Sequence, residues 1–292
     1  MDSIELLSHA KINLTLEVSA RRSDGYHDID SVVQIIDIAD VLSVSKADDA
    51  VIEVSADTAS VPSGPKNLVY RACEAFFEET GIRAGAKCRL VKRIPVQAGL
   101  GGGSGNAAAA IVALDRLYET GLPLQRLAEI AARVGSDSPL FIYGGTARIT
   151  GRGEVVEPLP DAPNLDIVVV KPDAGISTAW AYSELDRRPV ERTGASDRAD
   201  LAIREHDREA LLDSLANSFD AVACKALAEV REAKYVLEQA GASRVMLCGS
   251  GSAVFGVFDT RLQAEAAGVA LGARFTQVFV TRNIQRCRRS IQ

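Results

Sequence analysis

Residues 94–118, IPVQAGLGGGSGNAAAAIVALDRLY, place five glycines within seven positions and then a row of four alanines. The loop follows a segment typical of a strand and precedes apolar residues at helical spacing. Glycines at such a junction let the backbone approach an anion closely and direct free N–H groups at it. The stretch therefore predicts a strand, a phosphate-binding loop and a helix, although a flexible surface loop has the same composition.

The glycine loop matches neither of the two common nucleotide-binding templates. A Walker A loop needs Gly-Lys-Ser/Thr, which is absent, and the G-x-G-x-x-G template meets Asn106 or Ser104 where its third glycine belongs. Both residues stand where we expect the helix to begin, and either one fits as its N-cap or as an oxygen ligand to a metal or phosphate group. The residues alone predict a phosphate without identifying its carrier.

The composition describes a chain that can bury a large core but is poorly suited to nucleic acid. It has 292 residues, of which 47% are hydrophobic, and a net charge of -6. Because an acidic surface disfavours polynucleotide phosphates, we expect no nucleic-acid partner. The five cysteines lack C-x-x-C spacing, and the chain shows no signal sequence and no apolar run long enough for a bilayer. We expect a cytoplasmic protein with reduced thiols and no membrane partner.

Periodicity along the chain predicts mixed α and β structure in two lobes. Residues 9–20 alternate between apolar and polar types, which predicts a strand with Lys11 and Asn13 on its polar face. A linker at 159–164 separates an N-terminal lobe, 1–160, from a C-terminal lobe, 161–292. Further strands are expected at 31–45, 50–56, 87–95, 165–172 and 275–284, with a hairpin at 243–259. Helices are expected at 68–81, 107–118, 124–134, 177–186, 201–212, 216–219, 226–239 and 261–272.

Two other stretches have both a structural and a chemical interpretation. Asp137 lies in GSDSP, where it fits the start of a helix, with Ser138 as the cap, or a general base for a substrate hydroxyl. Gly249 and Gly251 flank Ser250 in a second glycine cluster, which fits a hairpin turn and equally a backbone wall against a phosphate. The residues leave both choices open.

Three stretches taken together, PVQAGLGGGSGNAAAA, GSDSPLF and CGSGSAVFG, resemble the GHMP kinase superfamily in order and spacing. More narrowly, residues 10–42, AKINLTLEVSARRSDGYHDIDSVVQIIDIADVL, are similar to the N-terminal signature of the 4-diphosphocytidyl-2-C-methyl-D-erythritol kinase family, and KNLVYRA and KPDAGISTAWAY also fit that family. The resemblance implies a two-lobed α+β fold. An N-terminal α/β lobe would bind ATP, a C-terminal lobe would be ferredoxin-like, and the active site would lie in the cleft between them.

The resemblance also implies a reaction, its cofactors and its partners. ATP, accompanied by Mg²⁺, would phosphorylate the 2-hydroxyl of the cytidyl substrate, a step in the non-mevalonate route to isoprenoid precursors. The partner would be this small molecule, and the protein a monomer or homodimer. The alternatives are a kinase of the same superfamily acting on homoserine, mevalonate or a sugar, a non-catalytic nucleotide-binding protein, and an RNA-binding module, which the net charge disfavours.

Position by position, the resemblance assigns residues to the acceptor side of the site. Asp137 matches the base that takes the hydroxyl proton, and Lys11 matches the lysine that polarises that hydroxyl. Retention of both argues against a non-catalytic protein. The substrate residues are an aromatic pair around cytosine, a reader of the cytosine edge and a neighbour of the lysine: Tyr26 and Tyr182, His27, and Asn13, respectively.

On the donor side, Asn67 matches a residue near the adenine, and the glycine loop matches the ATP phosphate loop. The family usually has Ser where Gly105 stands, so we expect weaker or altered phosphate contacts there. The resemblance assigns no carboxylate to a metal, so the metal ligands stay open. The loop residues are Pro95, Val96, Gln97, Ala98, Gly99, Leu100, Gly101, Gly102, Gly103, Ser104, Gly105 and Asn106.

Overall fold

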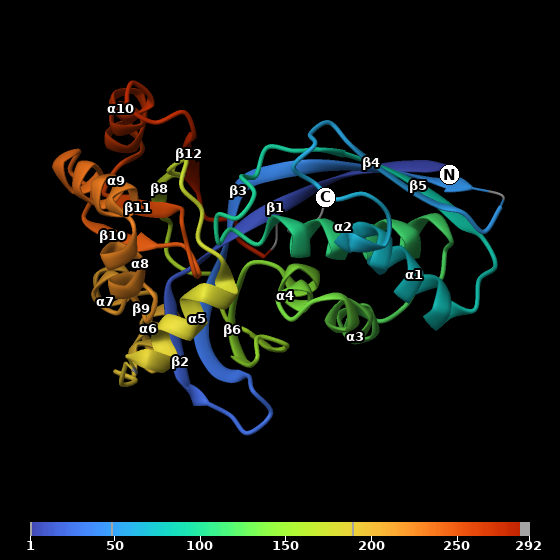
Figure 1. Cartoon of the computed structure of the whole chain (residues 1–292), viewed down its shortest axis with the longest axis horizontal. Helices are drawn as coiled ribbons and strands as arrows, with labels where there is room; N and C mark the ends of the chain where they lie inside the picture. Colours follow the sequence, from blue (N-terminus) through green and yellow to red (C-terminus); the bar gives the residue numbers. More distant parts are fainter. Residues whose placement is uncertain (1, 48, 189, 287–292) are drawn as a thin grey trace.

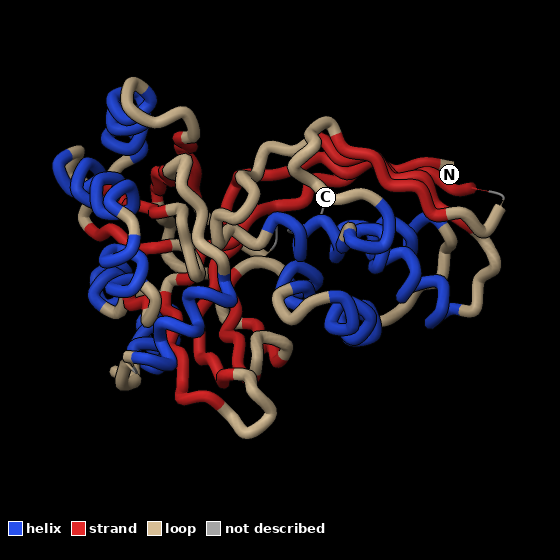
Figure 2. The backbone as a smooth tube through the Cα atoms, in the orientation of Figure 1, coloured by secondary structure: helices blue, strands red, loops and turns tan. Residues whose placement is uncertain are grey.

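A computed structural model describes residues 2–47, 49–188 and 190–286, which form two lobes side by side (Figure 1). In the first lobe, helices α1 to α4 cover one side of a sheet, and in the second, helices lie outside a smaller four-stranded sheet (Figures 1 and 2). The predicted α+β architecture is confirmed. The lobe boundary between residues 160 and 161 stays a prediction.

The first sheet is built on β3 (His27–Ala47), a strand of 21 residues rich in the β-branched types that favour strands. Most of the other strands pair directly with it. β1 (Ser3–Asn13), β2 (Thr15–Arg21), β5 (Gly85–Val91) and β6 (Thr146–Gly151) all run antiparallel to β3. β4 (Ile52–Ala56) adds in parallel to β5, and β7 (Val155–Pro158) pairs with β6.

The helices of the first lobe are α1 (Leu68–Thr80), α2 (Gly102–Leu117), α3 (Leu124–Val134) and α4 (Ser138–Tyr143), with a short 3-10 turn, η1 (Gly64–Lys66), before α1. Of these helices, α1 and α3 have nearly the predicted bounds, α2 begins before its predicted start at 107, and α4 was only one of the two interpretations given for GSDSP. Asn67 caps α1 by accepting a hydrogen bond from the Val69 N–H, and Gly81 ends it in the left-handed conformation. The alanine row of α2, residues 107–110, is fully buried, because small side chains let this helix pack closely inside the lobe.

The strand predicted at 9–20 is two strands, with a bend at Leu14 between β1 and β2. Lys11 and Asn13 do share one face, but both are buried. Thr15 and Glu17 on β2 are buried as well, because α6 (Ala195–Arg204) of the second lobe packs against them. Alternation alone indicated a polar face without showing that another lobe covers it.

The second lobe centres on β8 (Asp166–Val170), whose apolar residues are buried on both faces. The antiparallel order is β10-β11-β8-β12, with β10 (Arg244–Leu247) and β11 (Val254–Phe258) forming the predicted hairpin and β12 (Val278–Arg282) as the last strand. The remaining helices are α5 (Thr178–Arg187), α7 (Arg208–Asp213), α8 (Asp220–Ala226), α9 (Ala228–Gln239) and α10 (Arg261–Gly272).

Three local predictions for the second half of the chain are wrong. Residues 216–219 are not a helix, because β9 (Ala216–Asn217) pairs in parallel with β2 of the other lobe. The helix predicted at 201–212 is two helices, α6 and α7, separated by a turn in which His206 has a positive φ of 55°. α6 also begins at Ala195, six residues before the predicted start at 201. The hairpin of β6 and β7 carried no prediction.

The end of the described chain returns to the first lobe after β12. The Ile284 N–H donates to the Ile35 carbonyl at 2.8 Å, and the Gln34 amide donates to the Ile284 carbonyl at 3.0 Å. The rest of the arginine-rich terminus, including Cys287, lies outside the described residues. Within the described part of the chain, no helix is long and apolar enough to cross a membrane.

A buried carboxylate joins the lobes near the start of α6. Glu17 on β2 accepts hydrogen bonds from the backbone N–H groups of Thr193 at 2.7 Å, Gly194 at 2.9 Å and Ser196 at 3.0 Å. Burial acts to raise the pKa of Glu17, but these hydrogen bonds outweigh it and lower the pKa to about 2. The ionised side chain therefore stabilises the junction between β2 and α6.

We predict that Glu17→Gln lowers the free energy of unfolding by about 2 to 3 kcal/mol near neutral pH, because an amide replaces a charged acceptor. The folded pKa lies below the ordinary value of 4.5, so the stabilisation is complete above that value and is lost as the pH falls toward 2. Urea unfolding of both proteins across this range measures the difference. Glu53→Gln, at a residue on exposed β4, is the control, and a Glu17 effect that stayed constant with pH would contradict the prediction.

Candidate active site

Three segments meet backbone to backbone between the lobes. They are β1 at Lys11, the glycine loop, and the turn between β10 and β11. The Lys11 N–H donates to the Leu100 carbonyl at 3.0 Å, and the Ala253 N–H donates to the Ala98 carbonyl at 3.2 Å. A Cβ at Gly99 would lie 1.9 Å from the Cys248 carbonyl oxygen, so only glycine fits there. The loop is packed between two other segments and is not a flexible surface loop.

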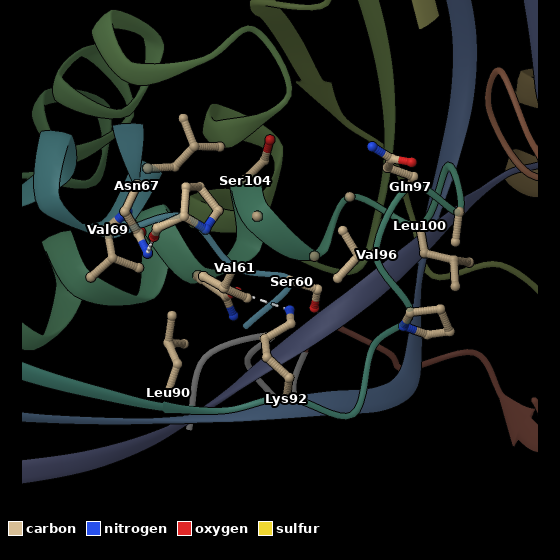
Figure 3. Close-up of a pocket in the computed structure, with 18 of the residues that line it drawn as sticks. Ser60, Val61, Asn67, Val69, Leu90, Lys92, Val96, Gln97, Leu100 and Ser104 are labelled. Atoms are coloured by element: carbon tan, nitrogen blue, oxygen red, sulfur yellow. Dashed lines mark hydrogen bonds between the residues drawn. The ribbon is translucent and has the colours of Figure 1, made fainter. Parts of the chain in front are cut away.

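A pocket of about 360 Å³ lies over this loop and the start of α1 (Figure 3). Asn67 and Val69 border it on the α1 side, and Leu90 of β5 and Lys92, just after that strand, also line it. The pocket brings together every predicted donor-side residue except Gly105. These are Asn67, Pro95, Val96, Gln97, Ala98, Gly99, Leu100, Gly101, Gly102, Gly103, Ser104 and Asn106.

The entrance of α2 differs from the prediction in its cap. The helix starts at Gly102 after Gly101, which has a φ of 71°, and no side chain caps it. Ser104 and Asn106 lie inside the helix, so the prediction that either is the N-cap is wrong. The first N–H groups of a helix have no partner within the helix, and without a capping side chain they are available to an anion in the pocket.

Gly105 lies on the other side of α2, against β1. A Cβ at this position would come within 2.9 Å of Ser8 Oγ and 3.0 Å of the His9 carbonyl oxygen. The Ser8 hydroxyl is buried and has no hydrogen-bond partner among the described residues. Gly105, where the family usually has serine, therefore faces β1. This position argues against the expected change in phosphate contacts.

A buried network beneath the pocket was not predicted. Asp40 on β3 is fully buried and accepts hydrogen bonds from Lys92, from the backbone N–H groups of Arg93 and Ile94, both at 2.8 Å, and from the Asn106 amide at 2.9 Å. The Lys92 ammonium also donates to Asn106 Oδ1 at 3.2 Å and lines the pocket. The sequence did contain a signal for this network. In the predicted strands 31–45 and 87–95, Asp40 and Lys92 occupy positions whose neighbours two residues away are apolar, so the alternation indicates that both face inward.

A second pocket of about 160 Å³ shares Gly99 and Gly101 with the first and holds both predicted catalytic residues. Lys11 Nζ donates to Asn13 Oδ1 at 2.6 Å and lies 3.9 Å from Asp137 Oδ2. The Asn13 amide in turn donates to Ser31 Oγ at 2.8 Å. The lysine is thus held in place by neighbours on the sheet, while its distance to Asp137 is too long for a direct hydrogen bond.

Asp137 has the exposure that chemistry at this site requires. It stands at the N-cap position of α4, yet its carboxylate makes no capping hydrogen bond. Ser138 is the first helical residue and not the cap. The Asp137 side chain is 39% exposed, whereas that of Lys11 is only 7% exposed. A helix-capping role therefore does not account for Asp137.

Two aromatic residues, Tyr182 and Phe219, line the second pocket, and His27 lies beside Tyr182 without lining that pocket. The Tyr182 ring lies 4.9 Å from the His27 ring and 4.9 Å from the Phe219 ring, measured between centroids. Burial raises the pKa of Tyr182 to about 12, and the negative charge of Asp137 acts in the same direction. The phenol therefore stays protonated near neutral pH. His27 Nε2 pairs with Asp186 Oδ1 at 2.8 Å.

The predicted aromatic pair is not in contact in the structure. Tyr26 is 55% exposed and does not line the second pocket. The Arg152 guanidinium lies over the Tyr26 ring at 4.9 Å and also lines the pocket, which connects Tyr26 to the site. Arg152 and Asp186 were not predicted. Asp186 follows Tyr182 by four residues on α5, so helical spacing was the signal for it.

Comparison with known proteins identifies the family. The domain described as "GHMP kinases N terminal domain" matches residues 67–145, and "GHMP kinases C terminal" matches residues 201–277. A 4-diphosphocytidyl-2-C-methyl-D-erythritol kinase of Moorella thermoacetica is 40% identical over 287 residues, which cover 97% of this chain and 100% of the relative. The chain belongs to this kinase family.

Further comparisons agree with this membership. The relative of the same description from Pelotomaculum thermopropionicum is 40% identical and covers 96% of this chain and 97% of its own length. A crystal structure of 4-(cytidine 5'-diphospho)-2C-methyl-D-erythritol kinase has a TM-score of 0.82 at 30% identity, covering 96% of this chain and 99% of that one. A homoserine kinase structure from Cytophaga hutchinsonii, with a TM-score of 0.81 at 18% identity over 100% of this chain and 97% of that one, shares the fold. The predicted GHMP kinase fold and the predicted ATP-dependent phosphotransferase are confirmed.

We predict that Gly105→Ser destabilises the protein by about 1 to 3 kcal/mol through crowding against Ser8, and leaves the KM for ATP unchanged. Gly103→Ser is the matched control. It adds the same side chain two residues away, at a position that lines the pocket of about 360 Å³, and we expect it to raise the KM for ATP. Urea unfolding and steady-state kinetics of the two variants make the comparison. A higher KM for ATP in stably folded Gly105→Ser would return Gly105 to the phosphate site.

Proposed function

We propose that the protein transfers the γ-phosphoryl group of ATP to the 2-hydroxyl of 4-diphosphocytidyl-2-C-methyl-D-erythritol, in the non-mevalonate route to isoprenoid precursors. The supporting observation is the wall of Gly99 and Gly101 that both pockets share. A nucleotide in the first pocket would present its terminal phosphate beside Lys11 and Asp137 in the second. The names of the relatives supply the substrate.

Each side of the transfer has residues suited to it. The acceptor hydroxyl would contact both Lys11 Nζ and Asp137 Oδ2, which are 3.9 Å apart. Asp137 would take the hydroxyl proton as the new O–P bond forms, while the bond to the β-phosphate breaks and ADP leaves. The uncapped N–H groups of α2 and the Lys92 ammonium would stabilise the phosphate charge.

We expect Mg²⁺ to accompany ATP and to neutralise part of the phosphate charge. No group of three His, Cys, Asp or Glu side chains that could hold a metal exists among the described residues. Magnesium commonly keeps several waters and binds through one or two carboxylates and the substrate phosphates, so a site of this kind fits. Asp137 is the one carboxylate among the residues that line the two pockets, and the Ser104 hydroxyl lies in the first turn of α2; both would be oxygen ligands for the ion.

The cytosine end would be selected by His27 more than by stacking. His27 Nε2 lies 2.8 Å from the Asp186 carboxylate, and in the tautomer that donates to this carboxylate from Nε2 the Nδ1 atom is an acceptor. The exocyclic amino group of cytosine is a matching donor. Tyr182 would supply the stacking face, and Arg152 would place a positive charge in the same pocket for the substrate diphosphate.

The proposal is tested by an ATP-dependent assay with the cytidyl substrate, homoserine and mevalonate. We expect turnover of the cytidyl substrate alone, and we expect Asp137→Asn to lower its kcat by about 10² to 10⁴ with ATP binding retained, because only the general base is lost. Asp213→Asn, at an exposed residue of α7, is the matched control. Preferred turnover of homoserine or mevalonate would overturn the proposed substrate, and unchanged kcat in Asp137→Asn would remove that residue as the base.

We predict that Tyr182→Ala raises the KM for the cytidyl substrate about tenfold and spares the KM for ATP, because base stacking contributes about 1 to 3 kcal/mol. Tyr182→Phe keeps the ring and loses only a phenol that stays protonated, so its KM should remain near that of the wild type. Steady-state kinetics with each substrate varied in turn gives both values. A loss of ATP affinity in Tyr182→Ala would place the nucleotide in the second pocket instead.

A further inference from the structure

A third cavity, of about 360 Å³, lies where β1, β3, the interlobe linker and the segment after β12 meet. None of its lining residues belongs to the two pockets of the candidate active site. It therefore has no part in the proposed phosphoryl transfer. Its lining is Leu7, His9, Asp37, Asn164, Arg282, Asn283, Ile284 and Gln285.

A break in the strand register brings two of these side chains together. His9 pairs with Ala39, but the next residue, Ala10, pairs with Ile36, so β3 carries two extra residues at this point. Asp37 is one of them. A bulge of this kind changes the direction of a side chain that would otherwise follow the pleat. Asp37 Oδ1 lies 3.9 Å from His9 Nδ1, which is too far for a hydrogen bond. A donor atom placed to one side of the line between these two atoms could form a hydrogen bond with each of them.

Asn283 in this cavity is hydrogen-bonded to Pro163 and Leu165, but two other side chains, His9 and Arg282, lack such partners among the residues that the structure describes. The His9 side chain is only 5% exposed, and its Nδ1 is buried without a hydrogen-bond partner in the described part of the chain. A buried polar group without a partner is unfavourable, and a ligand that hydrogen-bonds to it removes that cost. The Arg282 guanidinium is exposed and forms no ion pair or hydrogen bond with residues 2–47, 49–188 or 190–286. The cavity thus combines an acceptor pair at one place with an unpaired cation at another.

We propose that this cavity binds a small zwitterion, with its ammonium group between Asp37 and His9 and its carboxylate at Arg282. An ammonium donates several hydrogen bonds, so it can serve the carboxylate and the imidazole together and offset the carboxylate charge. A hydroxyl has one proton and satisfies both groups only if Nδ1 itself carries a proton. The Asn164 and Gln285 amides line the same cavity and offer further donors and acceptors.

Such a ligand would bridge the two lobes. Asp37 and His9 belong to strands of the first lobe, whereas Arg282 ends β12 of the second. His9 is also two residues from Lys11 on the same strand. Binding would therefore hold the lobes together close to the candidate active site without entering it.

Nuclear magnetic resonance of the full chain tests this site through the imidazole of His9. The chain has three histidines, His9, His27 and His206, so their ring signals can be assigned with His9→Gln and, should that variant not fold, by elimination with His206→Gln and His27→Gln. The probes are ω-amino acids from glycine to 6-aminohexanoate. We expect at least one of them to shift the His9 signals saturably, and acetate or ethylammonium alone to bind at least about tenfold more weakly.

Two variants at exposed positions test the two ends of the ligand. We expect Asp37→Asn and Arg282→Gln each to raise the Kd of the best probe about tenfold or more, with the paired surface variants Asp213→Asn and Arg244→Gln as matched controls. No shift of the His9 signals at about 50 mM of any probe would overturn the proposal. Equal binding of acetate alone, or binding that survives Asp37→Asn, would also overturn it.

Discussion

The close approach of two glycine-containing turns is the constraint on which the rest of the site depends. Gly99 of the first lobe lies against the Cys248 carbonyl of the second, and a Cβ at Gly249 would in turn come within 3.0 Å of the Gly99 carbonyl oxygen. Only residues without side chains allow backbones this close. Because the loop is held there, the start of α2 opens toward one pocket and Lys11 toward the other. The two glycine clusters are therefore parts of one structure, although they lie far apart in the sequence.

Burial of polar residues along β1 and β2 follows from the same arrangement. The second lobe covers a strand face that carries charges, and the two charged groups Glu17 and Lys11 have partners that offset the loss of water. Glu17 accepts three backbone hydrogen bonds, and Lys11 is bonded to Asn13. Asp137 is different, since it is more exposed and stands 3.9 Å from Lys11. Under the proposed function, Lys11 and Asp137 are not joined by a direct hydrogen bond, so both could contact the same substrate hydroxyl.

The parts of the fold that sequence predicts best are those set by local periodicity. α3 has the predicted bounds, 124–134, because its apolar residues repeat at helical spacing. β9 could not be predicted, since two residues become a strand only by pairing with β2 of the other lobe. The same limit applies to Lys92 and Arg152, which line pockets formed by segments that are distant in the sequence. The glycine loop was recognisable because its conformation requires glycines, and these are visible in the sequence. The N-cap of α2, Gly101, could not be predicted in this way, because it depends on packing against Phe141 and Lys11.

The proposed phosphoryl transfer depends on the position of one lobe relative to the other. Asp137 and Lys11 come from the first lobe, whereas Thr178, Tyr182 and Ser250, which line the same pocket, come from the second. A change of about 1 Å in such an arrangement is enough to misalign a phosphoryl transfer, which relies on positioning more than on covalent chemistry. Three separate connections resist this change: the contact between the glycine turns, the bonds from Glu17 to the start of α6, and the return of residues 283–286 to β3. The fold therefore uses buried polar bonds between the lobes, and not only apolar contacts, to hold the two pockets in a fixed relative position.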